Sequence, residues 1–154
     1  MTNKVRTCFW FDGKAEEAAT FYTSLIEGSR ITNVSRMAEG GPALMVDFVL
    51  AGVPYQALNG GPRYQLSEAA SISVSTEDQE ETDRLWNALT ADGGEESQCG
   101  WLKDRFGLSW QIVPKALSHF LGDPDRAAAG RAMQAMLQMR KIDIAKLEDA
   151  FRGQ

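Results

Sequence analysis

The chain has 154 residues, of which 44% are hydrophobic and 24% charged, and its formal net charge is −5 at pH 7. These values are typical of one soluble globular domain, or of two small modules that share a core. Lys and Arg are interspersed with Asp and Glu, which argues against a nucleic-acid-binding face, because such a face needs a basic stripe. No apolar run approaches the roughly 20 residues of a membrane-spanning helix.

The cysteine and histidine content argues against further kinds of functional site. Cys8 and Cys99 are too few for a disulfide framework, and the start of the chain, MTNKVRTCFWF, lacks the features of a signal peptide. We therefore expect a cytoplasmic protein whose two thiols are buried and inert. The one histidine, His119, leaves almost no material for a His-rich metal site or a serine-type triad, so we expect it to be a surface or packing residue.

Residues 4–62 read as one strand, one helix and three further strands. An aromatic-rich strand is expected over 5–11, and a helix over 14–27. The apolar stripe of that helix is Ala15, Ala18, Ala19, Tyr22 and Ile26. Turn residues then separate three strand candidates, at 29–37, 43–50 and 53–58.

The same order of one strand, one helix and three strands is expected again over residues 68–114. A strand over 70–75 places Ile72 and Val74 on one face, and Thr76 and Gln79 have the spacing of a helix capping box. The apolar stripe of the helix that follows is Thr82, Leu85, Trp86 and Leu89. Three short strands complete this half, at 95–99, 100–103 and 108–113.

A shift of the chain against itself by about 64 residues aligns the two halves. The shift brings Glu16-Glu17 onto Glu80-Glu81, and the order of elements also agrees. We therefore predict an internal duplication within a single domain. Its parts are a first module of residues 4–62, a second module of 68–114 and a helical extension of 115–154.

The stretch CGWLKDRFGLSWQIVP, residues 99–114, joins a turn to an alternating strand. Leu108, Trp110 and Ile112 fall on one face of that strand, and Ser109 and Gln111 on the other. A strand with the core on one side and a pocket on the other has this pattern. An ordinary half-exposed antiparallel strand fits it equally well.

The chain beyond Pro114 is rich in helix formers. A short helix over 117–121 is followed by a strong helix start at Asp123-Pro124 and a final helix that Asp143 can cap. Met133, Met136 and Leu137 form an apolar stripe on this extension, and Met139 extends it. We expect the stripe to pack on the sheet or on a partner subunit, because methionine fills irregular gaps.

Four segments together carry a resemblance to a known family. FWFDGKAEEAATFY, ALNGGP, CGWLKDRFGLSWQIVP and MLQMRKIDIAKLEDAF resemble the PhnB-like branch of the vicinal oxygen chelate superfamily, which includes glyoxalases, dioxygenases and bleomycin-resistance proteins. That branch often has the label 3-demethylubiquinone 3-methyltransferase-like. The resemblance implies an α+β fold of two βαβββ modules that form a curled, cup-like mixed sheet, with a C-terminal helical extension. It also implies a homodimer.

The cup of superfamily enzymes holds a divalent metal, and the resemblance assigns positions to its ligands. Those positions hold Arg6, Cys8 or Trp10 on the first strand, Asn59, then Ser71 or Ser73, and finally Gln111. A permanent cation repels a metal, and neutral amides and hydroxyls are weak ligands for divalent ions. We therefore predict no metal and no cofactor.

A metal-independent small-molecule binder is the function that these observations favour. The candidate pocket residues are Cys8, Trp10, Asn59, Ser71, Ser73, Trp101 and Gln111, with aromatic molecules among the candidate ligands. The polar members could instead satisfy sheet edges or buried water. The alternatives are a metal-dependent enzyme of the glyoxalase or dioxygenase type, an interaction module and, with less support, a methyltransferase. No glycine-rich loop for adenosylmethionine follows the first strand.

Overall fold

The computed structural model describes residues 3–154, which form two compact units, the first ending in the sequence at Leu66 and the second beginning at Ser67. The first unit contains β1 (Thr7–Phe11), α1 (Ala15–Leu25), β2 (Arg30–Arg36), β3 (Ala43–Leu50) and β4 (Val53–Asn59). These strands form one four-stranded mixed sheet in the order β1-β4-β3-β2, with β1 parallel to β4. The predicted strand–helix–three-strand order is confirmed.

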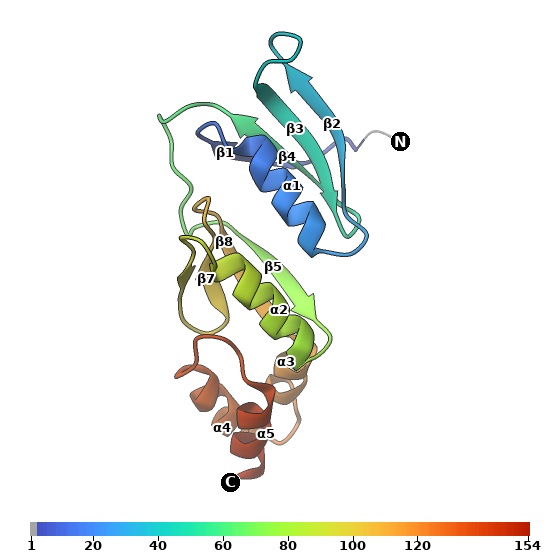
Figure 1. The fold of residues 1–154 in the computed structure, drawn as a ribbon. Coiled ribbons are helices and arrows are strands. Elements are labelled where there is room, and N and C mark those ends of the chain that lie inside the picture. Colours follow the sequence, from blue (N-terminus) through green and yellow to red (C-terminus); the bar gives the residue numbers. More distant parts are fainter. Residues whose placement is uncertain (1–2) are drawn as a thin grey trace. The chain divides into compact units, whose positions relative to one another are not determined.

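Helix α1 covers one face of the first sheet (Figure 1). Phe9 and Phe11 alternate with more exposed residues along β1, and their rings are at most 5% exposed. Tyr22, from the predicted stripe of α1, is fully buried and lies 6.3 Å from the ring of Phe48 on β3. The core of this unit therefore lies between α1 and the sheet, and the intervening residues of each strand point to the opposite face.

The second unit repeats this arrangement. It contains β5 (Ser71–Thr76), α2 (Gln79–Thr90), β6 (Glu95–Glu96), β7 (Trp101–Lys103) and β8 (Ser109–Pro114), with sheet order β5-β8-β7-β6. Its first and last strands are again parallel neighbours. The two sheets thus have the same topology, as an internal duplication predicts. The division of a single domain into residues 4–62, 68–114 and 115–154 stays a prediction.

The alternation predicted for the last strand is present in the structure. Leu108, Trp110 and Ile112 are at most 1% exposed and belong to the core beneath α2. The predicted capping box is wrong, however. Asp78 caps α2 by accepting a hydrogen bond from the Glu81 backbone N–H. Thr76 points into the core instead, where its hydroxyl lies 2.7 Å from that of Thr82.

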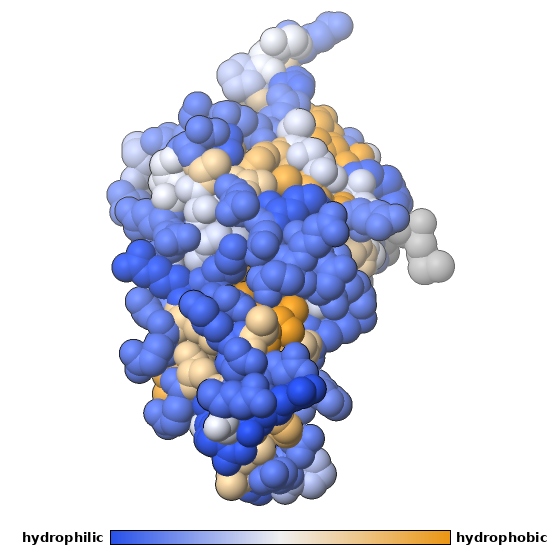
Figure 2. All heavy atoms as spheres, turned by 60° about the horizontal axis from the view of Figure 1, so that its bottom comes forward, coloured by the Kyte–Doolittle hydropathy of each residue, from blue (hydrophilic) through white to orange (hydrophobic). Residues whose placement is uncertain are grey.

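Three helices form the C-terminal extension: α3 (Lys115–Leu121), α4 (Arg126–Met136) and α5 (Ile144–Arg152). Leu117, Met139, Ile142 and Leu147 form its buried hydrophobic cluster. Met133 and Leu137 are 42% and 46% exposed, so the predicted apolar stripe is only partly buried. The face shown in Figure 2 is mainly hydrophilic, with small separate hydrophobic patches. Among the residues described, no helix combines the length and the apolar character needed to cross a membrane.

Residues 139–144 attach the extension to the second module, and we call them the strap. Backbone N–H groups of Cys99 and Gly100 donate to the carbonyls of Met139 and Arg140, each at 2.8 Å. From α2, the Gln79 amide donates to the Ile142 carbonyl and accepts from the Ile144 N–H. One side chain thus satisfies two backbone groups of the strap.

Replacing Gln79 with alanine is expected to loosen the strap. The change leaves the Ile142 carbonyl and the Ile144 N–H without these partners, which costs about 1–3 kcal/mol of unfolding free energy. Hydrogen exchange should accelerate mainly over residues 139–152. Gln134→Ala, at an exposed position of α4, is the matched control. Equal exchange in the two variants would show that Gln79 does not hold the strap.

Candidate functional site

The face of the second sheet that points away from α2 gathers most of the predicted pocket residues. Strand register puts neighbours from three strands into two rows: Ser71, Ser109 and Lys103 in one row, and Ser73, Gln111 and Trp101 in the other. We call this set the open face. Four of the seven predicted pocket residues, Ser71, Ser73, Trp101 and Gln111, therefore lie together.

Gln111 is half-buried and joins two strands of the open face. Its Nε2 donates to the Ser71 hydroxyl at 3.0 Å, diagonally across the pairing of β5 with β8. The bond orients the amide and uses one of its two N–H donors. The face therefore presents a fixed polar group at its centre.

Ser109 is the most unusual residue of the open face. It is 1% exposed, and its Oγ has no hydrogen-bond partner among the residues described. Together with Trp101, Lys103 and Glu95 it lines a cavity of about 120 Å³. A buried hydroxyl without a partner costs about 1–3 kcal/mol, so buried polar atoms are rarely left in this state. Ser109 thus lines the cavity, and the hydrogen-bonding capacity of its hydroxyl is unused among the residues described.

An ion pair lies beside this cavity. Lys103, the cross-strand neighbour of Ser109, places its Nζ 2.7 Å from Glu68 Oε1. The hydrogen bond that Lys103 donates to Glu68, and next the charge of Glu68, raise the pKa of Lys103, while the same hydrogen bond lowers the pKa of Glu68. Both groups are therefore charged at neutral pH.

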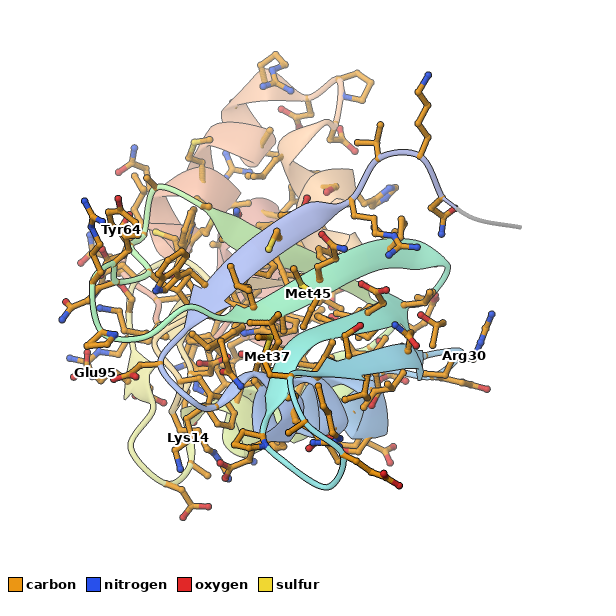
Figure 3. The ribbon with its side chains drawn as sticks, turned by 90° about the horizontal axis from the view of Figure 1, so that it is seen from above. Lys14, Arg30, Met37, Met45, Tyr64 and Glu95 are labelled. Carbon is orange, nitrogen blue, oxygen red and sulfur yellow. The ribbon has the colours of Figure 1, made fainter. Side chains whose placement is uncertain are left out.

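Cys8 and Trp10 lie on the first sheet, on the face opposite α1. Trp10 is held in place: its Nε1 donates to the Gly61 carbonyl at 2.8 Å, and its ring meets Tyr64 edge-on at 4.9 Å (Tyr64 is labelled in Figure 3). A Cβ on Gly60 would lie only 2.3 Å from the indole, so the backbone approaches Trp10 closely at that position. Trp10 thus packs on its own loop.

Asn59 is the predicted pocket residue that faces the helix-covered side of its sheet. It pairs with Phe11, on the helix-covered side of the first sheet. Its Oδ1 accepts from the Ala15 N–H at the start of α1, and its Nδ2 donates to the Ala43 carbonyl. The amide thus joins α1, β3 and β4, which is the alternative role that the sequence left open. We leave Asn59 out of the proposed site.

The prediction that both thiols are buried is wrong. Cys8 is exposed because alternation along β1 turns it away from the core, and Cys99 is half-buried in the turn before β7. Partial desolvation, and next the charge of Asp47, raise the pKa of Cys8, which keeps it a thiol. Thiols of this kind are poor nucleophiles.

The donor set does not fit the divalent metal of the superfamily. The described part of the chain contains no group of three or more His, Cys, Asp or Glu that could hold a metal ion. The Asn59 and Gln111 amides are engaged in bonds within their own units, and Arg6 forms an ion pair with Asp47 at 3.0 Å. A neutral thiol and serine hydroxyls complete the set, and such ligands bind divalent ions weakly.

Sequence reasoning missed four residues around the cavity: Glu68, Glu95, Lys103 and Ser109. The alternation along β8 already placed Ser109 beside Gln111 on the polar face, which was a usable signal. Lys103 and Glu95 become neighbours of that face only through strand register, since Glu95 pairs with Lys103. Glu68 lies before β5 and reaches Lys103 through its side chain. No pattern in the sequence marks either contact.

Comparison with solved structures first identifies the fold. A glyoxalase/bleomycin resistance protein from Albidiferax ferrireducens is 12% identical with a TM-score of 0.50, over 71% of this chain and 96% of that one. The genomically encoded fosfomycin resistance protein of Listeria monocytogenes is 14% identical with a TM-score of 0.54, over 79% and 98%. At these identities the likeness shows the fold alone. The predicted α+β fold of the vicinal oxygen chelate class is therefore confirmed.

The family follows from closer matches. The model of the family described as 3-demethylubiquinone-9 3-methyltransferase matches residues 3–113. A PhnB protein from Bacillus cereus, described as a candidate 3-demethylubiquinone-9 3-methyltransferase, is 32% identical with a TM-score of 0.66, over 73% of this chain and 99% of that one. The chain belongs to this PhnB-like family. Comparison with curated proteins gave no match. The family match ends at residue 113, before the helical extension.

Proposed function

We propose that the protein binds a small molecule without the help of a metal, and that its binding site is the open face of the second sheet. The observation that carries the proposal is the buried, unpartnered Ser109 hydroxyl that lines the cavity. A buried hydroxyl without a partner destabilises the folded chain unless a ligand or an ordered water completes its hydrogen bonds.

The other groups of the open face support a binding role. Ligand sites combine an apolar wall with a few oriented polar groups. Trp101 supplies a half-buried ring, and Gln111, fixed by its bond to Ser71, supplies an oriented amide. The site as proposed keeps Ser71, Ser73, Trp101 and Gln111 from the sequence-based set and adds Ser109.

We also propose that the protein acts as a homodimer in the cytoplasm. The likeness to the superfamily supports the dimer. The two free cysteines among the described residues suit a reducing compartment. Sedimentation analysis tests the first point: a monomer at micromolar concentration would contradict it.

A protein-observed NMR screen of small aromatic and polar compounds tests the binding proposal. The protein is dialysed against EDTA before the screen. We expect hits that shift amide signals of β5, β7 and β8, and affinities that EDTA treatment leaves unchanged. Gln111→Ala should weaken such hits by about 2- to 10-fold, the worth of one hydrogen bond.

The exposed-position variant Gln134→Ala is the control and should bind as the unchanged protein does. The proposal fails if no compound shifts those strands. It also fails if binding is lost on EDTA treatment and restored by a transition metal.

A further inference from the structure

We infer that the cavity at Ser109 takes the ammonium end of an organic amine. This inference rests on the proposed function and adds the chemical class of the ligand. The groups that carry it are the hydroxyl of Ser109, the carboxylate of Glu95 and the ring of Trp101. All three belong to the second unit and line the same cavity.

The charge of the cavity wall is the first argument. The charged residues that line it are Glu68, Glu95, Glu96 and Lys103. Three carboxylates against one ammonium leave a net charge of −2. Arg140 forms an ion pair with Glu96 at 3.6 Å and reduces this to −1. A cationic group is therefore attracted to the cavity, whereas a carboxylate or phosphate is repelled.

The second argument is that two of the three carboxylates already have hydrogen-bond or ion-pair partners. Glu68 is paired with Lys103, and Glu96 accepts a hydrogen bond from Trp86 Nε1 at 2.7 Å and contacts Arg140. Glu95, which is labelled in Figure 3, lies on the outer strand β6, and its side chain has neither a hydrogen bond nor an ion pair within the described chain. Its charge acts on Lys103 only at longer range. Glu95 is thus the carboxylate with acceptor capacity left for a ligand.

The Ser109 hydroxyl supplies a second acceptor, and it points to a ligand independently of the charges. A hydroxyl has two acceptor lone pairs, and an ammonium has three N–H donors. An ammonium in the cavity could donate to Ser109 Oγ and to Glu95 while it faces the Trp101 ring. Cation–π contact with tryptophan adds about 0.5–2 kcal/mol to such binding.

The size of the cavity limits how much of the ligand enters. A cavity of about 120 Å³ has room for an ammonium with one or two methylene groups. The remainder of the amine would therefore extend from the cavity along the open face, towards Trp101 and Gln111.

Three probes of similar shape test the inference by NMR titration at pH 7: 2-phenylethylamine, which is cationic, 2-phenylethanol, which is neutral, and 3-phenylpropionate, which is anionic. We expect the amine to bind at least tenfold more tightly than the alcohol, and the propionate to bind most weakly. Added salt should reduce the preference for the amine.

Two variants test whether the preference for the amine arises at the cavity. Glu95→Gln changes an exposed side chain and should abolish most of the preference for the amine, and Ser109→Ala should weaken amine binding severalfold. Glu80→Gln, at an exposed position of α2, makes the same charge change away from the cavity and is the matched control. Circular dichroism confirms that each variant is folded.

Two results would overturn the inference. One is equal binding of the amine and the alcohol, or tighter binding of the propionate. The other is no binding of the amine, as expected if water alone occupies the cavity. In either case, screen hits on β5, β7 and β8 would leave the proposed binding function standing, and the absence of all hits would end both.

Discussion

Replacing Trp110 with alanine is expected to lower the free energy of unfolding of the second unit by about 3–5 kcal/mol. The side chain is fully buried, and its Nε1 donates to Asp104 Oδ2 at 2.8 Å. The truncation removes a large ring from a closely packed core and also one bond of a buried carboxylate. Chemical denaturation followed by circular dichroism measures the loss.

Gln111→Ala is the matched comparison for Trp110→Ala, because the two residues are adjacent and point to opposite faces of β8. It removes the bond to Ser71 but leaves the core intact, so we expect a loss of about 1 kcal/mol. Equal losses in the two variants would contradict the assignment of core and open face on this strand.

Replacing Asp104 with alanine is expected to cost about 3–5 kcal/mol, from the loss of partners for several buried donors at about 1–3 kcal/mol each. Asp104 is 2% exposed, and its carboxylate accepts from the backbone N–H groups of Phe106 and Leu108 as well as from Trp110. It therefore fixes the turn that leads into β8. Thermal and chemical denaturation measure the effect.

Asp149→Ala, at an exposed position of α5, is the control and should change the stability by less than about 0.5 kcal/mol. Combining Asp104→Ala with Trp110→Phe, which keeps the ring but removes the N–H, should give less than the sum of the single losses. Strict additivity would mean that the Asp104–Trp110 bond contributes nothing.

The fold could be predicted from the sequence because its two periodicities are clear. Strand alternation at Leu108, Trp110 and Ile112 and the helical stripe that includes Trp86 both mark residues that the structure buries. Each pattern follows from the local backbone geometry of a helix or strand, so it can be recognised within the sequence of a single segment. The repeated order of elements then indicated a duplicated sheet unit.

The candidate site could be predicted only in part, because it depends on register between strands. Asn59 ends the expected β4, but pairing with Phe11 turns it towards α1, where it bonds to the Ala15 N–H. Ser109 is a candidate site residue because it is buried and pairs with Lys103 on the neighbouring strand β7. A register is fixed by tertiary packing, and a change of one residue moves every side chain to the other face.

Native mass spectrometry of the purified protein, together with elemental analysis, tests the central claim most directly. The account predicts a chain that carries no transition metal in stoichiometric amount and that forms a one-to-one complex with 2-phenylethylamine, reduced by Glu95→Gln. Zinc, iron, nickel or manganese retained at one ion per chain, with ligand binding that is lost when the ion is removed, would contradict it.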